Sequence, residues 1–314
     1  MRAVTAIGGE LAVTEQPNPA PGTGEVLVKV HAAGLNGADM LQRRGLYPPP
    51  PGVANPDVLG MELSGEVQLN GPGAARFKPG DQVMAIVPAG AQAEFAVVDE
   101  RMLLAVPERL DLVSAGGFPE VFTTAHDALF TQAGLVAGER LLVHGAAGGV
   151  GTAAVQLGRA AGARVTATVR NPDHRDAVAA LGATVIAPEG FGESGPFDVV
   201  LELVGAINLA ENLQSLETGG RIAIIGTGAG ATAEINLGLV MVKRARIHGS
   251  TLRARPLELK CIATRAVERS VLPALAAGEI TVPVAETFPL ERVADAYDRF
   301  RAGGKLGKVV LVSG

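Results

Sequence analysis

The first third of the chain alternates hydrophobic and polar residues in short runs separated by glycine and proline. The clearest run, Glu25–Gly34, follows the turn-forming segment Pro21–Gly24, and this alternation predicts a half-buried strand. Similar runs predict strands at Leu63–Leu69, Gln82–Val87 and Phe95–Val98. Short strands with this punctuation are typical of a small β-rich, barrel-like domain.

A run of prolines interrupts this part of the chain. Pro48, Pro49, Pro50 and Pro51 follow Tyr47 and lead to Gly52. Proline has no N–H group to donate, so four in succession cannot join a helix or a central strand. We therefore expect the segment from Tyr47 to Gly52 to be an exposed, stiff loop.

From about Phe118 onwards, strand-like and helix-like segments alternate, and several of the helix-like segments end at a glycine. The helices expected are Val121–Ala133, Gly149–Ala161, Asp173–Leu181 and Leu209–Leu216, and the strands expected are Arg140–His144, Arg164–Val169, Thr184–Ile186, Asp198–Val204, Arg221–Gly226 and Arg246–Gly249. This alternation predicts βαβ units on a parallel sheet. The strands are apolar on both faces, which indicates helices on both sides of the sheet.

The last part of the chain returns to a mixed pattern. Leu257–Arg269 and Leu290–Arg301 are expected to be helical, and Val282–Phe288 and Lys308–Val312 are expected to be extended.

Composition narrows the class of protein. A length of 314 residues corresponds to roughly two domains. The hydrophobic fraction of 47% and the charged fraction of 19% exclude extensive disorder. The only cysteine, Cys261, excludes a disulfide framework, an iron–sulfur cluster and a four-cysteine zinc site, and we expect it to pack as a small hydrophobic residue.

Charge and hydropathy bear on partners and location. The 27 basic and 32 acidic side chains give a net charge of −5, which argues against nucleic acid as a partner. No apolar run of about 18 residues predicts a membrane span, and the N-terminus lacks the apolar stretch of a signal peptide. We therefore expect a cytoplasmic protein without a membrane partner.

A run of small residues joins the strand that ends near His144 to the following helix. Gly148 and Gly149 would let a pyrophosphate approach the main chain, where the N–H groups at the helix start attract phosphate, and Gly151 would allow close packing. Ala146 stands where the usual dinucleotide fingerprint has its first glycine, so the strict pattern fails by one residue. The strand–turn–helix context still predicts a dinucleotide site. The alternative is a tight turn without a ligand.

The end of the next strand points to the form of the dinucleotide. Enzymes that use NAD carry Asp or Glu there, to bind the ribose 2′-hydroxyl. This chain has Arg170 at that point, with His174 and Arg175 close behind. A guanidinium can pair with a 2′-phosphate through two parallel hydrogen bonds, so NADPH is favoured. The alternative is that these are solvated surface cations.

A resemblance to a known family rests on six segments, namely Ala32–Asp39, Arg44–Pro48, Leu59–Gly65, Phe77–Asp81, Ala146–Gly151 and Gly307–Leu311. In these segments the chain resembles the zinc-independent quinone oxidoreductases of the medium-chain dehydrogenase/reductase superfamily, the zeta-crystallin-like group. The resemblance implies an α/β fold in three stretches. These are a GroES-like β-rich substrate domain (1–117), a doubly wound parallel Rossmann sheet that binds NADPH (118–255) and a C-terminal return to the first domain (256–314).

The positions of the zinc ligands distinguish branches of this superfamily. Zinc-dependent members carry Cys where Asn36 stands and His where Met61 stands, and Met is a poor zinc ligand. The resemblance therefore implies an enzyme without a metal, in which the nicotinamide passes hydride to a quinone. Two alternatives are an NADPH-dependent reductase of enones or alkenals and, more remotely, a non-catalytic NADPH-binding protein.

The resemblance also suggests roles for residues of the first domain and the residues that follow it. Tyr47 is the candidate catalytic residue, as proton donor or positioning group, with a mere wall of the pocket as the alternative. Asn36 and Thr124 are expected to contact the cofactor, although Thr124 also suits a routine helix position. Asp39 is expected to be the N-cap of a helical turn, Asp39–Arg43.

Further cofactor contacts are expected at the ends of parallel strands, where ligands of open α/β sheets bind. The expected contacts are Ala147, Gly148, Gly149 and Val150 in the glycine loop, Gly226 and Thr227 after one strand, and Ser250, Thr251 and Leu252 after another. Arg253 and Arg255 are expected to face solvent, with substrate as the alternative, and Lys305 is a candidate phosphate contact. His31, His144 and His248 are expected to pack rather than to catalyse.

The resemblance also bears on assembly. Its members are usually dimers formed by edge strands of the Rossmann sheets, so we expect a homodimer with Gly226–Leu237 near the interface.

Overall fold

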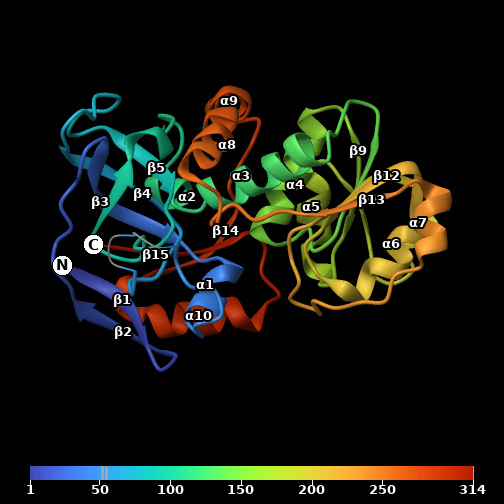
Figure 1. Cartoon of the computed structure of the whole chain (residues 1–314), viewed down its shortest axis with the longest axis horizontal. Helices are drawn as coiled ribbons and strands as arrows, with labels where there is room; N and C mark the ends of the chain where they lie inside the picture. The colour runs from blue at the N-terminus through green and yellow to red at the C-terminus, as the bar shows by residue number, and fades with distance from the viewer. Residues whose placement is uncertain (51–52, 54–55, 314) are drawn as a thin grey trace. The chain divides into compact units, whose positions relative to one another are not determined.

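The computed structural model describes residues 1–50, 53 and 56–313, and the chain divides into two compact units (Figure 1). One unit contains Met1–Thr123 together with Arg253–Gly314, and the other contains Thr124–Leu252. The boundaries lie a few residues from those expected from the sequence pattern. The first unit is therefore built from both ends of the chain, and the second from one continuous stretch.

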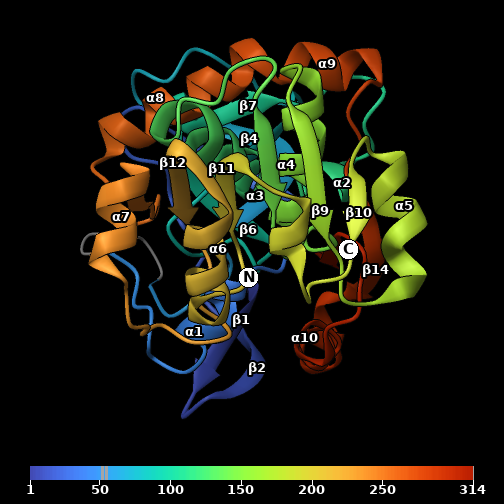
Figure 2. The same cartoon turned by 90° about the vertical axis from the view of Figure 1, so that its right-hand side faces the viewer.

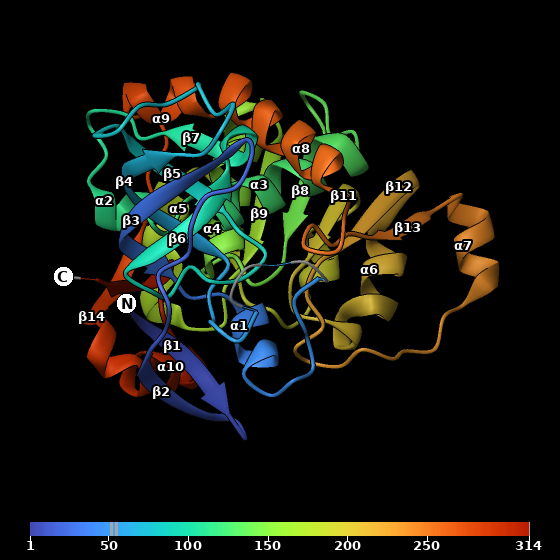
Figure 3. The same ribbon diagram turned by 60° about the vertical axis from the view of Figure 1, so that its left-hand side comes forward.

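The first unit is organised around a seven-stranded sheet in the order β14-β15-β3-β4-β5-β7, with β6 pairing with β3 off this path (Figure 3). Its strands are β3 (Glu25–Gly34), β4 (Glu62–Asn70), β5 (Gln82–Ile86), β6 (Phe95–Asp99), β7 (Leu103–Ala105), β14 (Val284–Pro289) and β15 (Lys308–Val312). All pairs are antiparallel except β14 with β15. The alternation seen in the sequence places Val26, Val28 and Val30 of β3 in the core.

Short helices and one hairpin complete this unit. The helices are α1 (Gly37–Gln42), α2 (Leu112–Ala115), α8 (Leu257–Ser270), α9 (Leu272–Ala277) and α10 (Val293–Ala302), with 3₁₀ turns η1 (Glu100–Met102) and η6 (Leu290–Arg292). The hairpin pairs β1 (Arg2–Ile7) with β2 (Glu10–Glu15). A second core forms where α10 packs its fully buried Tyr297 against Leu311 and Leu35.

The second unit is a six-stranded, all-parallel sheet in the order β10-β9-β8-β11-β12-β13 (Figure 2). Its strands are β8 (Arg140–Val143), β9 (Arg164–Thr168), β10 (Thr184–Ile186), β11 (Phe197–Glu202), β12 (Leu216–Ile224) and β13 (Arg246–Gly249). Its helices are α4 (Gly149–Ala160), α5 (Arg175–Ala180), α6 (Leu209–Ser215) and α7 (Leu237–Lys243), with 3₁₀ turns η3 (Pro172–His174), η4 (Phe191–Ser194) and η5 (Ala206–Asn208). The predicted α/β fold is confirmed.

The chain passes between the units twice, and the first crossing lies in a helix whose two halves differ in winding. α3 (Pro119–His126) contains the boundary, and the π-helical segment η2 (Asp127–Gln132) continues it. The sequence pattern predicted one helix over Val121–Ala133. In the structure its second half is wound more widely, with the N–H group of Ala133 donating to the carbonyl of Ala128.

The strand order reverses in the middle of the parallel sheet. The chain passes from β8 to β9 and β10 on one side, and then from β11 to β12 and β13 on the other. β8 and β11 are therefore neighbours at the point of reversal. In open α/β sheets ligands bind at the carboxyl ends of the strands at such a point, and the glycine loop follows β8.

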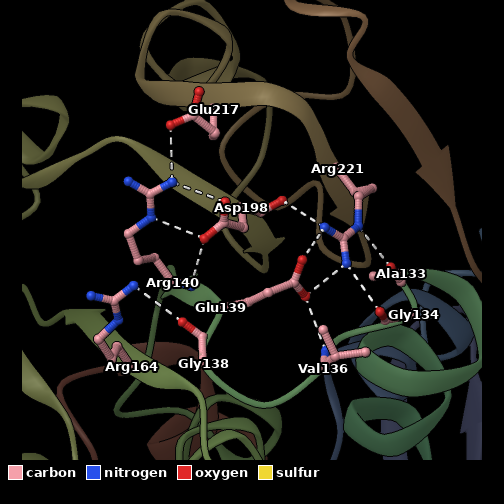
Figure 4. Close-up of polar contacts among 10 residues, drawn as sticks. All are labelled: Ala133, Gly134, Val136, Gly138, Glu139, Arg140, Arg164, Asp198, Glu217 and Arg221. Atoms are coloured by element: carbon pink, nitrogen blue, oxygen red, sulfur yellow. Dashed lines mark hydrogen bonds and ion pairs between the residues drawn. The ribbon is translucent and has the colours of Figure 1, made fainter.

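The amino ends of β8, β11 and β12 are held by half-buried ion pairs (Figure 4). At the start of β8 the guanidinium of Arg140 donates to both carboxylate oxygens of Asp198, each at 2.9 Å. Arg221 of β12 donates to Glu139 at 2.7 and 2.9 Å and to the carbonyl of Ala133 at 2.8 Å. These contacts fix the amino ends of the strands. The loops with the expected cofactor residues lie at the opposite, carboxyl ends.

Several sequence-based expectations need correction in detail. The helix predicted from Asp173 begins at Arg175, because the 3₁₀ turn η3 precedes it and Asn171 accepts the N–H group of Asp173 at 3.1 Å. The pattern also missed β1, β2, β7, α2, α7 and α9. The β1–β2 turn uses Gly8 and Gly9, whose φ angles of 59° and 87° explain the two glycines.

The loop of prolines is described only in part. Pro48, Pro49 and Pro50 lie in neither a helix nor a strand, as expected, while Pro51 and Gly52 lie outside the described residues. Of the helices in the described ranges, none has the length and hydropathy needed to cross a membrane.

Candidate functional site

The glycine loop presents unpaired N–H groups at the start of α4. Gly148 is the N-cap residue, and no side chain caps the helix. The N–H groups of Gly149, Val150 and Gly151 donate to no described residue, and the first turn carries no acidic side chain. A helix of 12 residues with an open, half-exposed first turn is suited to an anion such as a pyrophosphate.

Two glycines of this loop differ in what a side chain would meet. A Cβ atom at Gly151 would lie 2.5 Å from the carbonyl oxygen of Gly145 and 2.6 Å from Cα of Ala146. At Gly148 it would meet only the Gly145 oxygen, at 3.4 Å. Gly151 therefore permits close packing of helix on loop, whereas the space beside Gly148 is open to a ligand.

Parallel pairing gathers most of the expected cofactor residues at one edge of the sheet. The edge carries Ala147, Gly148, Gly149 and Val150 after β8, Arg170, His174 and Arg175 after β9, Gly226 and Thr227 after β12, and Ser250, Thr251 and Leu252 after β13. Thr124 of α3 belongs to the same unit. A hydrogen bond of 3.0 Å from Ser250 Oγ to Asp127 Oδ2 ties the end of β13 to η2.

The end of β9 is cationic. The side chain of Arg170 is exposed and makes neither a hydrogen bond nor an ion pair with any described residue. Arg175 is half-buried and donates through Nε to the carbonyl of Val169 at 3.2 Å, which holds it at the strand end. His174 ends the turn between them. The guanidinium of Arg170 is therefore free to bind a ligand, and that of Arg175 is held by one hydrogen bond.

A buried polar network behind the glycine loop was not predicted from the sequence. His144 is 1% exposed, and its ring nitrogens lie 3.1 Å from Thr168 Oγ1 and 2.8 Å from Asn212 Oδ1. Glu202 accepts Nδ2 of Asn212 at 2.8 Å and the N–H group of Val204 at 2.7 Å. The sequence did contain one indication of this network, because Glu202 is an acidic residue at the end of the largely apolar strand β11.

The network settles how His144 is protonated. Burial lowers the pKa of His144, so the ring is neutral at pH 7. Asn212 spends its N–H on Glu202, so its Oδ1 accepts from Nε2 of the histidine, and Nδ1 accepts from the Thr168 hydroxyl. His144 packs in the core, as expected, and holds the loops after β8 and β11.

In the first unit, Asn36 rather than Asp39 is the N-cap residue of α1. The expectation that Asp39 caps a turn over Asp39–Arg43 is wrong, because the helix begins at Gly37. Asp39 is the third helical residue, and its Oδ2 reaches back to accept the N–H group of Asn36 at 2.7 Å. Asn and Asp are both good N-caps, so the sequence alone did not distinguish them.

The side chain of Asn36 belongs to a buried charged cluster. Lys308 Nζ donates to Glu62 Oε1 at 2.6 Å and to Asn36 Oδ1 and the Leu35 carbonyl at 2.7 Å each. Asn36 Nδ2 donates to Glu62 at 2.9 Å and to the Gly34 carbonyl at 3.3 Å. Both amide hydrogens of Asn36 are thus spent within the protein, so a ligand can meet its side chain only at Oδ1.

Asp39 lies beside this cluster and is itself fully buried. Burial raises the pKa of Asp39 to about 7, against the N–H group of Asn36 and the ammonium of Lys308, which favour the carboxylate. Its second oxygen, Oδ1, has no hydrogen-bond partner among the described residues. Sequence reasoning missed Glu62 and Lys308, although each is a charged residue in an apolar strand.

Tyr47 is held against a buried arginine. The ring of Tyr47 is half-buried and faces the guanidinium of Arg253, whose Cζ lies 4.8 Å from the ring centroid. The expectation that Arg253 faces solvent is wrong, because its side chain is 7% exposed and bonded on all sides to carbonyl oxygens. Arg255, two residues on, is half-buried.

Two other expectations concern Lys305 and Cys261. Lys305 is half-buried, with Nζ 3.8 Å from the centroid of the Phe300 ring. Burial, together with the charges of Lys308 and Arg299, lowers the pKa of Lys305 to about 8. Cys261 is buried against the sulfur of Met102, as expected of a small hydrophobic residue.

The side chains at the two superfamily zinc positions lie buried in the first unit. Asn36 is 6% exposed and Met61 is 4% exposed. In the described ranges of the chain, no three His, Cys, Asp or Glu side chains are grouped so as to hold a metal ion.

Comparison with protein families covers both units. Residues 22–108 match the family described as alcohol dehydrogenase GroES-like domain. Residues 149–269 match the family described as zinc-binding dehydrogenase. The two matches follow each other in the order of the β-rich unit and the parallel sheet.

Individual relatives match over nearly the full length. Human quinone oxidoreductase is 31% identical over 94% of this chain and 91% of its own length. An acryloyl-coenzyme A reductase from Metallosphaera sedula is 32% identical over the whole of both chains. Among solved structures, Escherichia coli quinone oxidoreductase complexed with NADPH superposes with a TM-score of 0.88 at 25% identity, covering 99% of this chain and 100% of that one.

Proposed function

The chain belongs to the quinone oxidoreductase family of the medium-chain dehydrogenase/reductase superfamily, and from this premise we propose that it is an NADPH-dependent, zinc-independent quinone reductase. The observation that carries the cofactor assignment is the edge of the parallel sheet. There an uncapped helix start and the uncommitted guanidinium of Arg170 follow neighbouring strands.

Different residues of this edge bind different parts of the cofactor. The N–H groups of Gly149, Val150 and Gly151 bind the pyrophosphate, with Ala147 and Gly148 leaving room for it. Arg170, assisted by His174 and Arg175, binds the 2′-phosphate. The remaining contacts, to the nicotinamide end, are assigned to Asn36, Thr124, Gly226, Thr227, Ser250, Thr251 and Leu252.

The reaction needs a hydride and a proton. When NADPH is bound, its nicotinamide would supply the hydride, and a quinone that accepted it would become a hydroquinone monoanion. Tyr47 donates the proton that completes the hydroquinone, and solvent restores the phenol. The alternative, in which Tyr47 only walls the pocket, leaves the proton to water.

The proposed independence from zinc rests on residue chemistry. Asn36 and Met61 occupy the two superfamily zinc positions, and neither thioether nor carboxamide is a preferred zinc donor. The amide of Asn36 is instead locked between Lys308 and Glu62. A quinone accepts hydride without a strong Lewis acid, so the chemistry proposed does not call for a metal.

A second candidate is an NADPH-dependent reductase of a conjugated carbon–carbon double bond. The acryloyl-coenzyme A reductase that matches this chain from end to end favours it, because that name denotes an activated alkene as substrate. The same edge would bind the cofactor in both cases.

Steady-state assays separate these candidates. NADPH oxidation is measured with a panel of benzo- and naphthoquinones and with enones, alkenals and acryloyl-coenzyme A, each as kcat/KM. The quinone proposal expects the highest values for quinones, and the reverse order would favour the second candidate. Reduction of NADP⁺ by a secondary alcohol, with neither class accepting hydride, would contradict both. Tight NADPH binding without turnover would indicate the non-catalytic alternative.

We also propose a homodimer in the cytoplasm. β13 is an edge strand of the parallel sheet, and the neighbouring helix α7 exposes Leu237, Met241 and Val242, each 70% or more. An exposed strand edge beside apolar side chains suits pairing with a second copy. Light scattering at micromolar concentration should give twice the chain mass of 32.0 kDa.

A further inference from the structure

Arg253 is a buried cation whose hydrogen-bond partners are all uncharged. Nε donates to the carbonyl of Pro88 at 2.7 Å, one terminal nitrogen to the carbonyl of Tyr47 at 2.8 Å, and the other to Gln42 Oε1 at 2.8 Å. The guanidinium forms no ion pair with any carboxylate in the described part of the chain. Its charge is compensated by three oxygen dipoles and by the face of the Tyr47 ring.

Such a charge is costly to bury. A desolvated cation normally keeps a carboxylate partner, and an apolar side chain would pack the same space at lower cost. Burial lowers the pKa of Arg253, although guanidinium remains charged in proteins. The arrangement therefore calls for a reason beyond packing.

The segment that follows Tyr47 has few backbone N–H groups with which to form hydrogen bonds of its own. Tyr47 is followed by four prolines, none of which has an N–H group to donate to a neighbouring carbonyl. Arg253 supplies the missing donor at the carbonyl of Tyr47 and covers one face of its ring at the same time. Its bond to Gln42, the last residue of α1, ties the same point to the helix that Asn36 caps.

We propose that Arg253 is a positioning residue for Tyr47, which fixes the phenol and stabilises the negative charge left on it when the proton passes to substrate. In that step the O–H bond of Tyr47 breaks and an O–H bond forms on the reduced quinone. The phenolate is held beside the guanidinium until solvent returns a proton. The inference rests on the proposed function, in which Tyr47 donates that proton.

The first test is kinetic and uses a double-variant cycle. Tyr47→Phe is expected to lower kcat with quinones by roughly 100-fold, the usual contribution of a general acid. Arg253→Gln is expected to lower kcat by about tenfold with little change in KM for NADPH, and Arg253→Lys, which keeps the charge, recovers part of the loss. The double variant Arg253→Gln/Tyr47→Phe should be no slower than Tyr47→Phe alone, since one residue acts through the other. Losses that multiply would overturn the inference.

The second test is spectroscopic and needs no turnover. The chain has two tyrosines and no tryptophan, so Tyr297→Phe leaves Tyr47 as the only strong emitter. In this background Arg253→Gln should change Tyr47 emission and increase its quenching by acrylamide. Arg43→Gln is the matched control, because Arg43 lies over the other tyrosine, 6.0 Å from the Tyr297 ring centroid. It should leave both Tyr47 emission and kcat unchanged.

The two tests separate the inference from the proposed function. If Tyr47→Phe keeps full kcat, the proton-donor role fails, and the positioning role fails with it. If Tyr47→Phe is slow but Arg253→Gln leaves kcat and Tyr47 emission unaltered, only the inference fails. If circular dichroism shows that Arg253→Gln does not fold, both tests are made with Arg253→Lys instead. A Lys variant with wild-type kcat and wild-type quenching then contradicts the inference.

Discussion

At the scale of single residues, we propose that Arg170 determines the preference for NADPH over NADH. Its guanidinium is uncommitted at the end of β9, where NAD enzymes place an acid. Arg170→Ala is expected to weaken NADPH binding by roughly 10- to 100-fold and to leave NADH within about twofold, because only NADPH carries the 2′-phosphate. Calorimetric titration of both cofactors measures this.

Arg164 provides the control for that prediction. It lies at the opposite, amino end of β9 and donates to the carbonyl of Gly138 at 3.1 Å (Figure 4). Arg164→Ala should leave both affinities unchanged. Equal losses of NADPH and NADH in Arg170→Ala would show that this guanidinium does not bind the phosphate.

Asp39 gives a prediction about pH. Its pKa in the folded protein, about 7, is above the ordinary value of 3.8, so between these values the folded state binds the extra proton. Stability from this group therefore falls as pH rises through that window. Asp39→Asn removes the titrating group, so the stability of the variant relative to that of the wild type should increase from pH 4.5 to 7.5. Thermal melting across this range measures the gain, and parallel profiles would contradict it.

Single residues also mark where sequence reasoning stops. The role proposed for Arg170 could be predicted, because it depends on the place of this residue in a local strand–turn–helix pattern. Arg253 was expected at the surface, because the pattern cannot show that Tyr47, Pro88 and Gln42 converge on it. The pair of Glu62 and Lys308 was missed for the same reason, since its members lie far apart in the sequence.

At the scale of elements, the loop before α4 allows close packing, and we propose that it also binds the cofactor. A Cβ atom at Gly151 would overlap the backbone of Gly145 and Ala146, whereas one at Gly148 makes only an ordinary contact. Gly151→Ala should therefore lower the midpoint of urea unfolding. Gly148→Ala should leave the midpoint unchanged and weaken NADPH binding at least tenfold, because the added methyl fills the phosphate space. Unfolding and calorimetry on both variants check this pair, and a Gly148→Ala protein with normal affinity would refute the loop assignment.

Elements with strong periodicity were predicted best. β13 and β10 of the parallel sheet and β15 of the first sheet match the expected ranges residue for residue, since a glycine lies at or close to one end of each. Short helices were missed, because one or two turns contain too few residues to show a helical period. α7 is an example, since its apolar residues lie at the surface and its period does not report burial.

At the scale of the whole molecule, the proposed mechanism predicts indifference to chelators. The residues at the two superfamily zinc positions are Asn36 and Met61, and no metal-binding group of acidic, His or Cys side chains occurs in the described ranges. Dialysis against EDTA and then 1,10-phenanthroline should therefore leave quinone reductase activity intact. Loss of activity that zinc restores would contradict the mechanism.

At this scale the fold class could be predicted from the sequence, but the pairing of strands distant along the chain could not. Alternating strands and helices predict the parallel sheet that the structure shows, and the glycine loop predicts at which edge of it a ligand binds. The sequence pattern alone does not show that β15 inserts between β14 and β3, because pairing partners distant along the chain leave no local periodicity.

That insertion has a consequence for how the protein matures on the ribosome. Thr124–Leu252 is one continuous stretch, whereas β3 pairs with β15, which is translated after that whole stretch. Until then the carboxylate of Glu62 lacks its ammonium partner, and the edge of β3 that β15 will cover is bare. During synthesis the parallel-sheet unit is therefore complete in sequence before the sheet of the first unit receives β15.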